Sequence, residues 1–184
     1  MKKILLLFCF SSFLTIHAQD TSQHQKNIRN HELKLNSLNL ALFSALDISY
    51  EYILNNQSSV GASVYILTKT PGNENEIKLF SMTPFYRKYF SAKRANGFFA
   101  EGFGMINIFD KTDEGDFIDK KLVARETNLA IGVSIGTKFL FRENFVVEAY
   151  LGVGTNLINN SEIDTGNNNQ HIIGRSGLLL GYRF

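Results

Sequence analysis

The chain has 184 residues and a formal net charge of +2, from 19 basic and 17 acidic side chains. This length suits one domain, and the near balance of charge argues against a nucleic-acid partner, which would call for a basic patch. The single cysteine, Cys9, lies in an apolar run near the start. A mature chain without that run therefore uses neither disulfides nor thiolate chemistry.

Residues 1–18 are typical of a secretory signal peptide. Lys2 and Lys3 give a basic start, residues 4–16 are mainly apolar, and Ala18 offers a small residue for cleavage. The apolar run is shorter than the about 20 residues that a membrane-spanning helix needs. An uncleaved anchor is the alternative. Cleavage after Ala18 removes two lysines and leaves 17 basic against 17 acidic residues.

Residues 19–31 are polar and aperiodic, and we expect a flexible periplasmic lead-in there. From residue 32 onward, the pattern has a period of two, with Gly, Asn and Ser at the breaks. This alternation predicts eight strands at about 32–41, 44–54, 58–68, 76–90, 97–109, 122–140, 145–158 and 171–184. Helical periodicity is not evident after residue 18. Pro84 removes a backbone donor inside the fourth segment and predicts a local irregularity.

The connections between these segments differ in length. Short connections at 55–57, 91–96 and 142–144 alternate with longer polar stretches at 69–75, 110–121 and 159–170. The connection near Ser44 is the exception, because it is short where a long one is expected. Outer-membrane barrels alternate short periplasmic turns with longer external loops. The pattern therefore predicts an all-β, eight-stranded, antiparallel up-and-down transmembrane barrel over residues 32–184.

Two kinds of barrel fit the alternation. A soluble, lipocalin-like barrel turns its apolar face inward around a ligand, whereas a transmembrane barrel turns it toward lipid. In the sixth segment, Leu129, Ile131, Val133 and Ile135 share one face, and the opposite face is rich in Gly, Ser and Ala. Small residues suit the crowded interior of an eight-stranded barrel. Aromatic residues also gather near the predicted periplasmic edge, as they do at membrane interfaces. We therefore favour the transmembrane barrel.

A set of charged residues falls on the inward face at similar depth, toward the predicted periplasmic end. Their signs alternate around the barrel, in the order Glu51, Arg87, Glu101, Lys138, Glu148 and Arg183. Lys34 is a further candidate, and Asp47 is expected to pair with Arg175 higher in the barrel. Isolated buried charges are costly, so we expect a paired network that plugs the barrel and fixes strand register. A proton or ion path is the alternative, although an eight-stranded barrel has no open channel.

Catalytic and metal-binding patterns are weak. His171 shares the last long loop with Ser161, Glu162 and Asp164, a set that a barrel hydrolase could combine. The acidic loop 110–121 has a glycine at its sixth position, as a calcium loop does, but Lys121 stands at the twelfth position, where a bidentate Glu is needed. Solvated loop residues explain both patterns. We therefore predict no catalytic residue, cofactor or metal, and weak calcium binding is the alternative for the acidic loop.

The end of the chain carries the most specific pattern. Leu178, Leu180, Tyr182 and the terminal Phe184 share one face of the last segment. Together with the N-terminal segment and the eight alternating strands, this ending resembles the small outer-membrane barrels of the OmpA/OmpX type. The resemblance covers nearly the whole chain from residue 32. It implies that the barrel assembly machinery recognises the last strand, and it implies roles in membrane integrity, adhesion or surface interaction through the loops.

We accordingly predict a non-enzymatic, monomeric protein of the outer membrane, surrounded by outer-membrane lipids, with a structural or surface-interaction role. One alternative is a barrel enzyme that modifies lipid, for which His171 and Ser161 must converge on the lipid-facing rim. The other is a soluble periplasmic lipid carrier, for which the apolar face must line a cavity.

Overall fold

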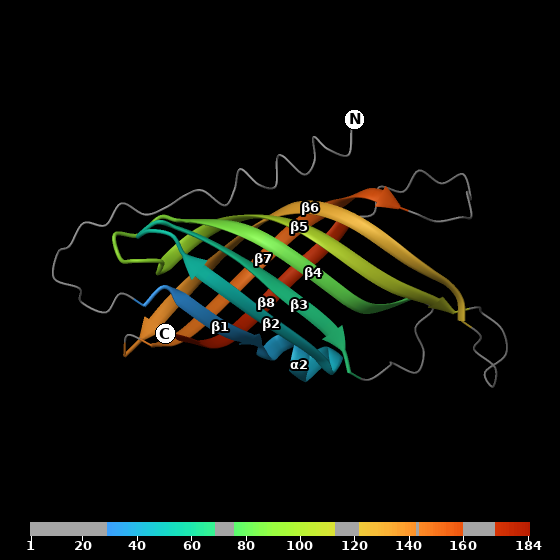
Figure 1. Ribbon diagram of the computed structural model, residues 1–184, viewed down its shortest axis with the longest axis horizontal. Coiled ribbons are helices and arrows are strands. Elements are labelled where there is room, and N and C mark those ends of the chain that lie inside the picture. The colour runs from blue at the N-terminus through green and yellow to red at the C-terminus, as the bar shows by residue number, and fades with distance from the viewer. Residues whose placement is uncertain (1–28, 69–75, 113–121, 143, 160–171) are drawn as a thin grey trace, which may run out of the picture.

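The computed structural model describes residues 29–68, 76–112, 122–142, 144–159 and 172–184. The expected signal peptide and all but the last three residues of the expected lead-in lie outside these residues. The described residues form β1 (His31–Asn36), α2 (Ser37–Phe43), β2 (Ala45–Ile53), β3 (Ser58–Leu67), β4 (Glu76–Tyr89), β5 (Gly97–Thr112), β6 (Leu122–Phe141), β7 (Phe145–Asn159) and β8 (Ile172–Arg183). Each strand pairs antiparallel with the next, and β1 pairs antiparallel with β8. The predicted eight-stranded up-and-down barrel is confirmed (Figure 1).

The tight turns gather at the end of the barrel that holds the C-terminus, and α2 lies toward the other end (Figure 1). We call the end with the tight turns the turn rim; it comprises residues 54–57, 90–96, 142 and 144. Backbone bonds tie it together. The amide of Ala95 donates to the carbonyl of Asn56 at 2.8 Å, and the amide of Arg183 donates to the carbonyl of Asn144 at 2.7 Å. The turns and the last strand therefore brace one another.

The helix α2 corrects the prediction that the first strand runs to residue 41. Leu38, Leu40 and Leu42 recur at every second position, which imitates a strand. The side chain of Asn36 instead caps the first turn by accepting from the amide of Asn39, and Ser44 ends the helix in the left-handed conformation with φ 50°. The first connection is therefore longer than the sequence suggested, and the exception near Ser44 disappears. Within the described part of the chain, no helix is long and apolar enough to cross a membrane.

Pro84 does not shift the strand register, but the pairing of β4 with β5 is interrupted at Thr83 and Pro84, where a backbone donor is missing. The pairs Met82–Ile106 and Phe85–Phe103, on either side of it, belong to one register. Pro84 lies on the exposed face, and the neighbouring β3 pairing continues through it. The shift in the β4–β5 register lies instead between Lys78 and Phe80.

The two faces of the sheet differ in chemistry, and the apolar face is the outer one. Ile135 is 71% exposed and Leu151 69%, whereas Glu51 and Arg87 are fully buried. A soluble lipid carrier needs the opposite arrangement, so this alternative is wrong. We call the outward apolar residues of all eight strands the apolar belt; members include Leu33, Ile48, Val60, Met82, Ile106, Ile131, Val133, Ile135, Leu151, Val153, Leu178 and Leu180.

Aromatic rings fill the inside of the barrel where the facing strand offers a glycine. A methyl group added to Gly61 would come within 2.4 Å of the ring of Phe85. The same addition to Gly136 would come within 2.5 Å of the ring of Phe99. The small residues of the inward face therefore leave the room that these rings occupy.

Candidate functional site

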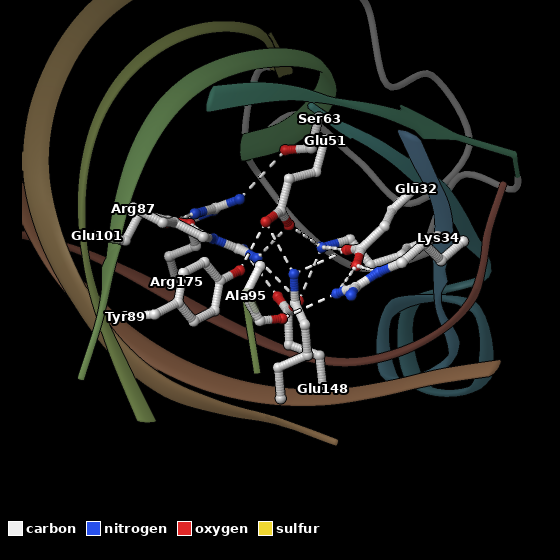
Figure 2. Close-up of polar contacts among 12 residues, drawn as sticks. Glu32, Lys34, Glu51, Ser63, Arg87, Tyr89, Ala95, Glu101, Glu148 and Arg175 are labelled. Atoms are coloured by element: carbon white, nitrogen blue, oxygen red, sulfur yellow. Dashed lines mark hydrogen bonds and ion pairs between the residues drawn. The ribbon is translucent and has the colours of Figure 1, made fainter. Parts of the chain in front are cut away.

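A buried network of ion pairs occupies the inside of the barrel next to the turn rim. Strand alternation points its side chains inward from every strand except β3, and Figure 2 shows them converging on the barrel centre. We call these residues the charge network: Glu32, Lys34, Glu51, Arg87, Glu101, Lys138, Glu148, Arg175 and Arg183. Four are carboxylates and five are cations, so the formal charges nearly cancel.

Glu51 is the central acceptor of the network. One of its carboxylate oxygens accepts from the Arg87 guanidinium at 2.8 Å and from the Lys34 ammonium. The other accepts from the Lys138 ammonium at 2.8 Å and from the Tyr89 hydroxyl at 2.6 Å. Both oxygens are therefore fully engaged by donors, three of which carry positive charge.

Arg87 donates hydrogen bonds to three carboxylates of the network. Its Nε donates to Glu101 at 2.6 Å, and its Nη1 donates to both Glu51 and Glu148 at 2.8 Å. Its Nη2 lies 2.7 Å from the second oxygen of Glu148, which completes a two-pronged ion pair. The guanidinium also lies 4.4 Å from the ring centres of both Phe85 and Phe99. Aromatic faces replace part of the hydration that this buried cation has lost.

The network extends to the turn rim through Glu32. This carboxylate accepts from Lys138 at 2.7 Å and from the Nε of Arg183 at 2.8 Å. Arg183 also donates to the backbone carbonyls of Arg94 and Ala95, at 3.2 and 2.9 Å. The last strand therefore holds both the charge network and the β4–β5 turn through one side chain.

The expected pair between Asp47 and Arg175 is wrong. Arg175 instead donates to Glu101, and its guanidinium lies 4.6 Å from the ring centre of Tyr150. Asp47 accepts from the side-chain amides of Asn36 at 2.9 Å and Asn39 at 2.6 Å. The helix that the sequence analysis missed brings Asn39 to Asp47 and so supplies a neutral partner.

The structure brings the six predicted ring residues into one connected network and adds Lys34 to it. The six residues alternate in sign in the order of the strands, as predicted. The network extends beyond this ring, because β1 contributes both Glu32 and Lys34 and β8 contributes Arg175 as well as Arg183. Glu32 and Tyr89 were missed. Glu32 has the same strand parity as Lys34, so the alternation in the sequence was the signal that could have found it.

Every carboxylate of the network has at least two cationic partners within 4 Å. A carboxylate held in this way is a poor general base, because several cations stabilise its charged form. The arrangement instead fills and cross-links the barrel. Breaking one buried pair typically costs about 3–5 kcal/mol, so the network couples the stabilities of the strands it joins.

The four residues of the predicted assembly signal face outward on β8. Leu178, Leu180, Tyr182 and Phe184 are between 43% and 53% exposed. The ring of Phe184 stacks on His31 with 5.7 Å between ring centres, and that of Tyr182 meets Phe145 edge-on at 5.6 Å. An aromatic cluster therefore marks the turn rim where β8 closes on β1.

The candidate catalytic set of His171, Ser161, Glu162 and Asp164 lies outside the described residues. So does most of the acidic loop, of which residues 110–112 extend β5. Among the described residues, no group of three or more His, Cys, Asp or Glu side chains is placed to hold a metal ion.

A family model matches nearly the whole chain. A family model described as a protein of unknown function, DUF3575, matches residues 4–177. The chain belongs to this family. A search of curated proteins finds no match.

Among solved structures, the chain is similar to the N-terminal β-barrel domain of Pseudomonas aeruginosa OprF. The TM-score is 0.50 at 14% sequence identity, and the match covers 85% of this chain and 98% of that domain. At this identity the likeness establishes a shared barrel fold.

Proposed function

We propose that this protein is a non-enzymatic outer-membrane barrel with a structural or surface-interaction role, whose lumen is closed by the charge network. The last strand presents its outward residues to the barrel assembly machinery, and the polar loops opposite the turn rim face the cell exterior. The turn rim then lies on the periplasmic side, as short turns do in such barrels.

The observation that carries this proposal is the apolar belt. A closed barrel has no free strand edges, so its backbone polar groups are satisfied within the sheet. Val133, Ile135 and Leu151 are each more than 60% exposed on its outer wall, while charged side chains are buried inside. Water disfavours such a surface, and the hydrocarbon core of a membrane favours it.

The charge network supports a closed lumen. Its side chains reach the barrel axis from seven strands and bond to one another (Figure 2). A conducting path at this level requires several of these ion pairs to break together. We therefore assign the network a structural role, as a plug that also fixes strand register.

Membrane fractionation of the full-length chain, with a heat-modifiability gel, tests the location. The expected result is recovery in the outer membrane and faster migration of the unheated sample. Recovery in the soluble periplasmic fraction would contradict the proposal.

Planar-bilayer recording tests the plug separately. The wild-type protein should give no steady conductance, whereas an open porin on the same bilayer serves as the positive control. Steady ion conductance by the wild-type barrel would refute the plug while leaving the membrane location intact.

A further inference from the structure

The outer surface of the turn rim carries cations that the charge network does not use. Lys93 and Arg142 are exposed there, Arg94 is partly exposed, and Lys88 is exposed on the adjoining end of β4. The carboxylates described at this end, those of Glu32, Glu51, Glu101 and Glu148, all lie buried inside the barrel. In the part of this rim that the structure describes, the buried carboxylates are therefore paired with buried cations, whereas the exposed cations of the rim have no such partners in the charge network.

A polar pocket lies among these cations, between the β2–β3 and β4–β5 turns. Its volume is about 470 Å³, and it is lined by Asn55, Asn56, Gln57, Ser91 and Arg94, with Leu54 and Ala92. Arg94 is fixed there by donating to the side-chain oxygens of Asn56 at 3.1 Å and Asn30 at 2.6 Å. Both partners are neutral, and no carboxylate among the described residues pairs with this guanidinium. Partial burial and the neighbouring Arg183 cation lower the pKa of Arg94, so a bound anion would relieve unfavourable electrostatics.

An apolar groove lies beside this pocket on the outer wall. It measures about 600 Å³ and is lined by Phe90, Phe98, Ile135, Ala149 and Leu151, and by Leu38 of α2. The small residues Gly136, Thr137 and Ala149 also line it. Phe90 lines the groove and Ser91, the next residue, lines the pocket, so the two hollows are neighbours.

We propose that the pocket and the groove together bind one anionic glycerophospholipid. The pocket holds the phosphate through Arg94, with Lys93 of the same turn nearby, and one acyl chain lies in the groove. This inference rests on the proposed membrane location. The apolar groove favours a lipid over free phosphate, because a free anion makes no use of it. The cations at one end of the groove favour an amphiphile over the apolar face of a second barrel.

The sequence contains no tryptophan, which allows a clean optical test. A Phe98→Trp variant places a single reporter in the groove. The barrel is reconstituted in phosphatidylcholine vesicles that contain increasing fractions of phosphatidylglycerol with brominated chains, which quench tryptophan on contact. The expected result is a preference for phosphatidylglycerol over phosphatidylcholine of roughly five- to thirtyfold at this position, as one or two lysine or arginine contacts to an anionic lipid provide.

Two variants in the reporter background locate the site. Lys93→Gln and Arg94→Gln should each lower the preference by up to about fivefold, and Arg94→Lys should keep more of it than Arg94→Gln. Arg142→Gln is the matched control, because it removes one rim cation from the β6–β7 turn and leaves the pocket intact; its preference should not change. Lys93 is exposed, so its substitution reports on binding even if Arg94→Gln fails to fold. An equal loss in the Arg142 variant would show general attraction to the rim and overturn the site.

Competition with free phosphate distinguishes a lipid headgroup from a soluble anion as the ligand of the pocket. Sodium phosphate added at constant ionic strength should leave the preference unchanged; its loss would assign the pocket to a soluble anion instead. If the Phe98→Trp protein with an unchanged pocket is quenched equally by both lipids, the proposed lipid site is overturned while the membrane location stands. Absence of quenching by any brominated lipid means that the belt does not face a bilayer, and it overturns the proposed membrane location as well.

Discussion

Replacing Arg87 with alanine should destabilise the barrel strongly, because this side chain donates hydrogen bonds to three carboxylates. The substitution removes donors from Glu101, Glu51 and Glu148, all at 2.6–2.8 Å. It also removes the cation between the rings of Phe85 and Phe99. Each carboxylate keeps at least one cation, Arg175 for Glu101 and Lys34 for the other two. We therefore expect a loss near the lower end of the range for a broken buried pair, about 3 kcal/mol.

Urea unfolding in lipid vesicles measures this loss. With an m-value of about 2 kcal/mol per molar urea, a loss of about 3 kcal/mol lowers the midpoint by roughly 1.5 M. Lys88→Ala is the matched control, since Lys88 is the next residue of β4 and its side chain is exposed on the outer face. That change should stay within about 0.5 kcal/mol, as surface substitutions usually do. Equal midpoints for the two variants would refute the assignment of Arg87 as the central cation of a buried network.

Three further predictions concern other parts of the barrel. Gly136→Ala should lower the urea midpoint by the equivalent of about 1–3 kcal/mol, since the added methyl group meets the ring of Phe99, whereas Gly102→Ala has open space and should be neutral. Asn36→Ala should cost about 1–2 kcal/mol in the same assay, because it removes the α2 cap and the donor to Asp47, and an unchanged midpoint would show that neither bond stabilises the barrel. Leu151→Lys should cost about 2–4 kcal/mol in vesicles if the middle of β7 faces lipid; a neutral effect would mean that water covers this wall.

The strands and their faces could be predicted from the sequence because both depend on local pattern. A period of two with glycine and asparagine at the breaks is visible without any knowledge of partners, and antiparallel neighbours follow from short turns. The helix α2 could not be found in this way. Its leucines alternate like those of a strand, and only the capping side chain of Asn36 distinguishes the two readings.

The charge network was only partly predictable for a physical reason. Strand parity determines which residues point inward, so Glu51, Arg87 and Lys138 could be placed inside the barrel. Parity does not give the height along the barrel axis of each inward side chain, because that height depends on strand tilt and stagger. It therefore does not show which side chains from opposite sides of the barrel come into contact. The partner of Arg175 is therefore Glu101, whereas a simple estimate of height along the strands suggested Asp47.

The contribution of β8 to the charge network has a consequence for the order of folding. The strands from β1 to β7 carry four carboxylates of the network and only three of its cations, Lys34, Arg87 and Lys138. The two remaining cations, Arg175 and Arg183, arrive with β8. A seven-stranded sheet therefore keeps an excess negative charge on its inner face, and Glu32 lacks one of its partners. We expect electrostatic attraction between these two cations and the inner face, in addition to backbone pairing, to favour the docking of β8. We therefore expect closure of the sheet and completion of the charge network to occur in the same step.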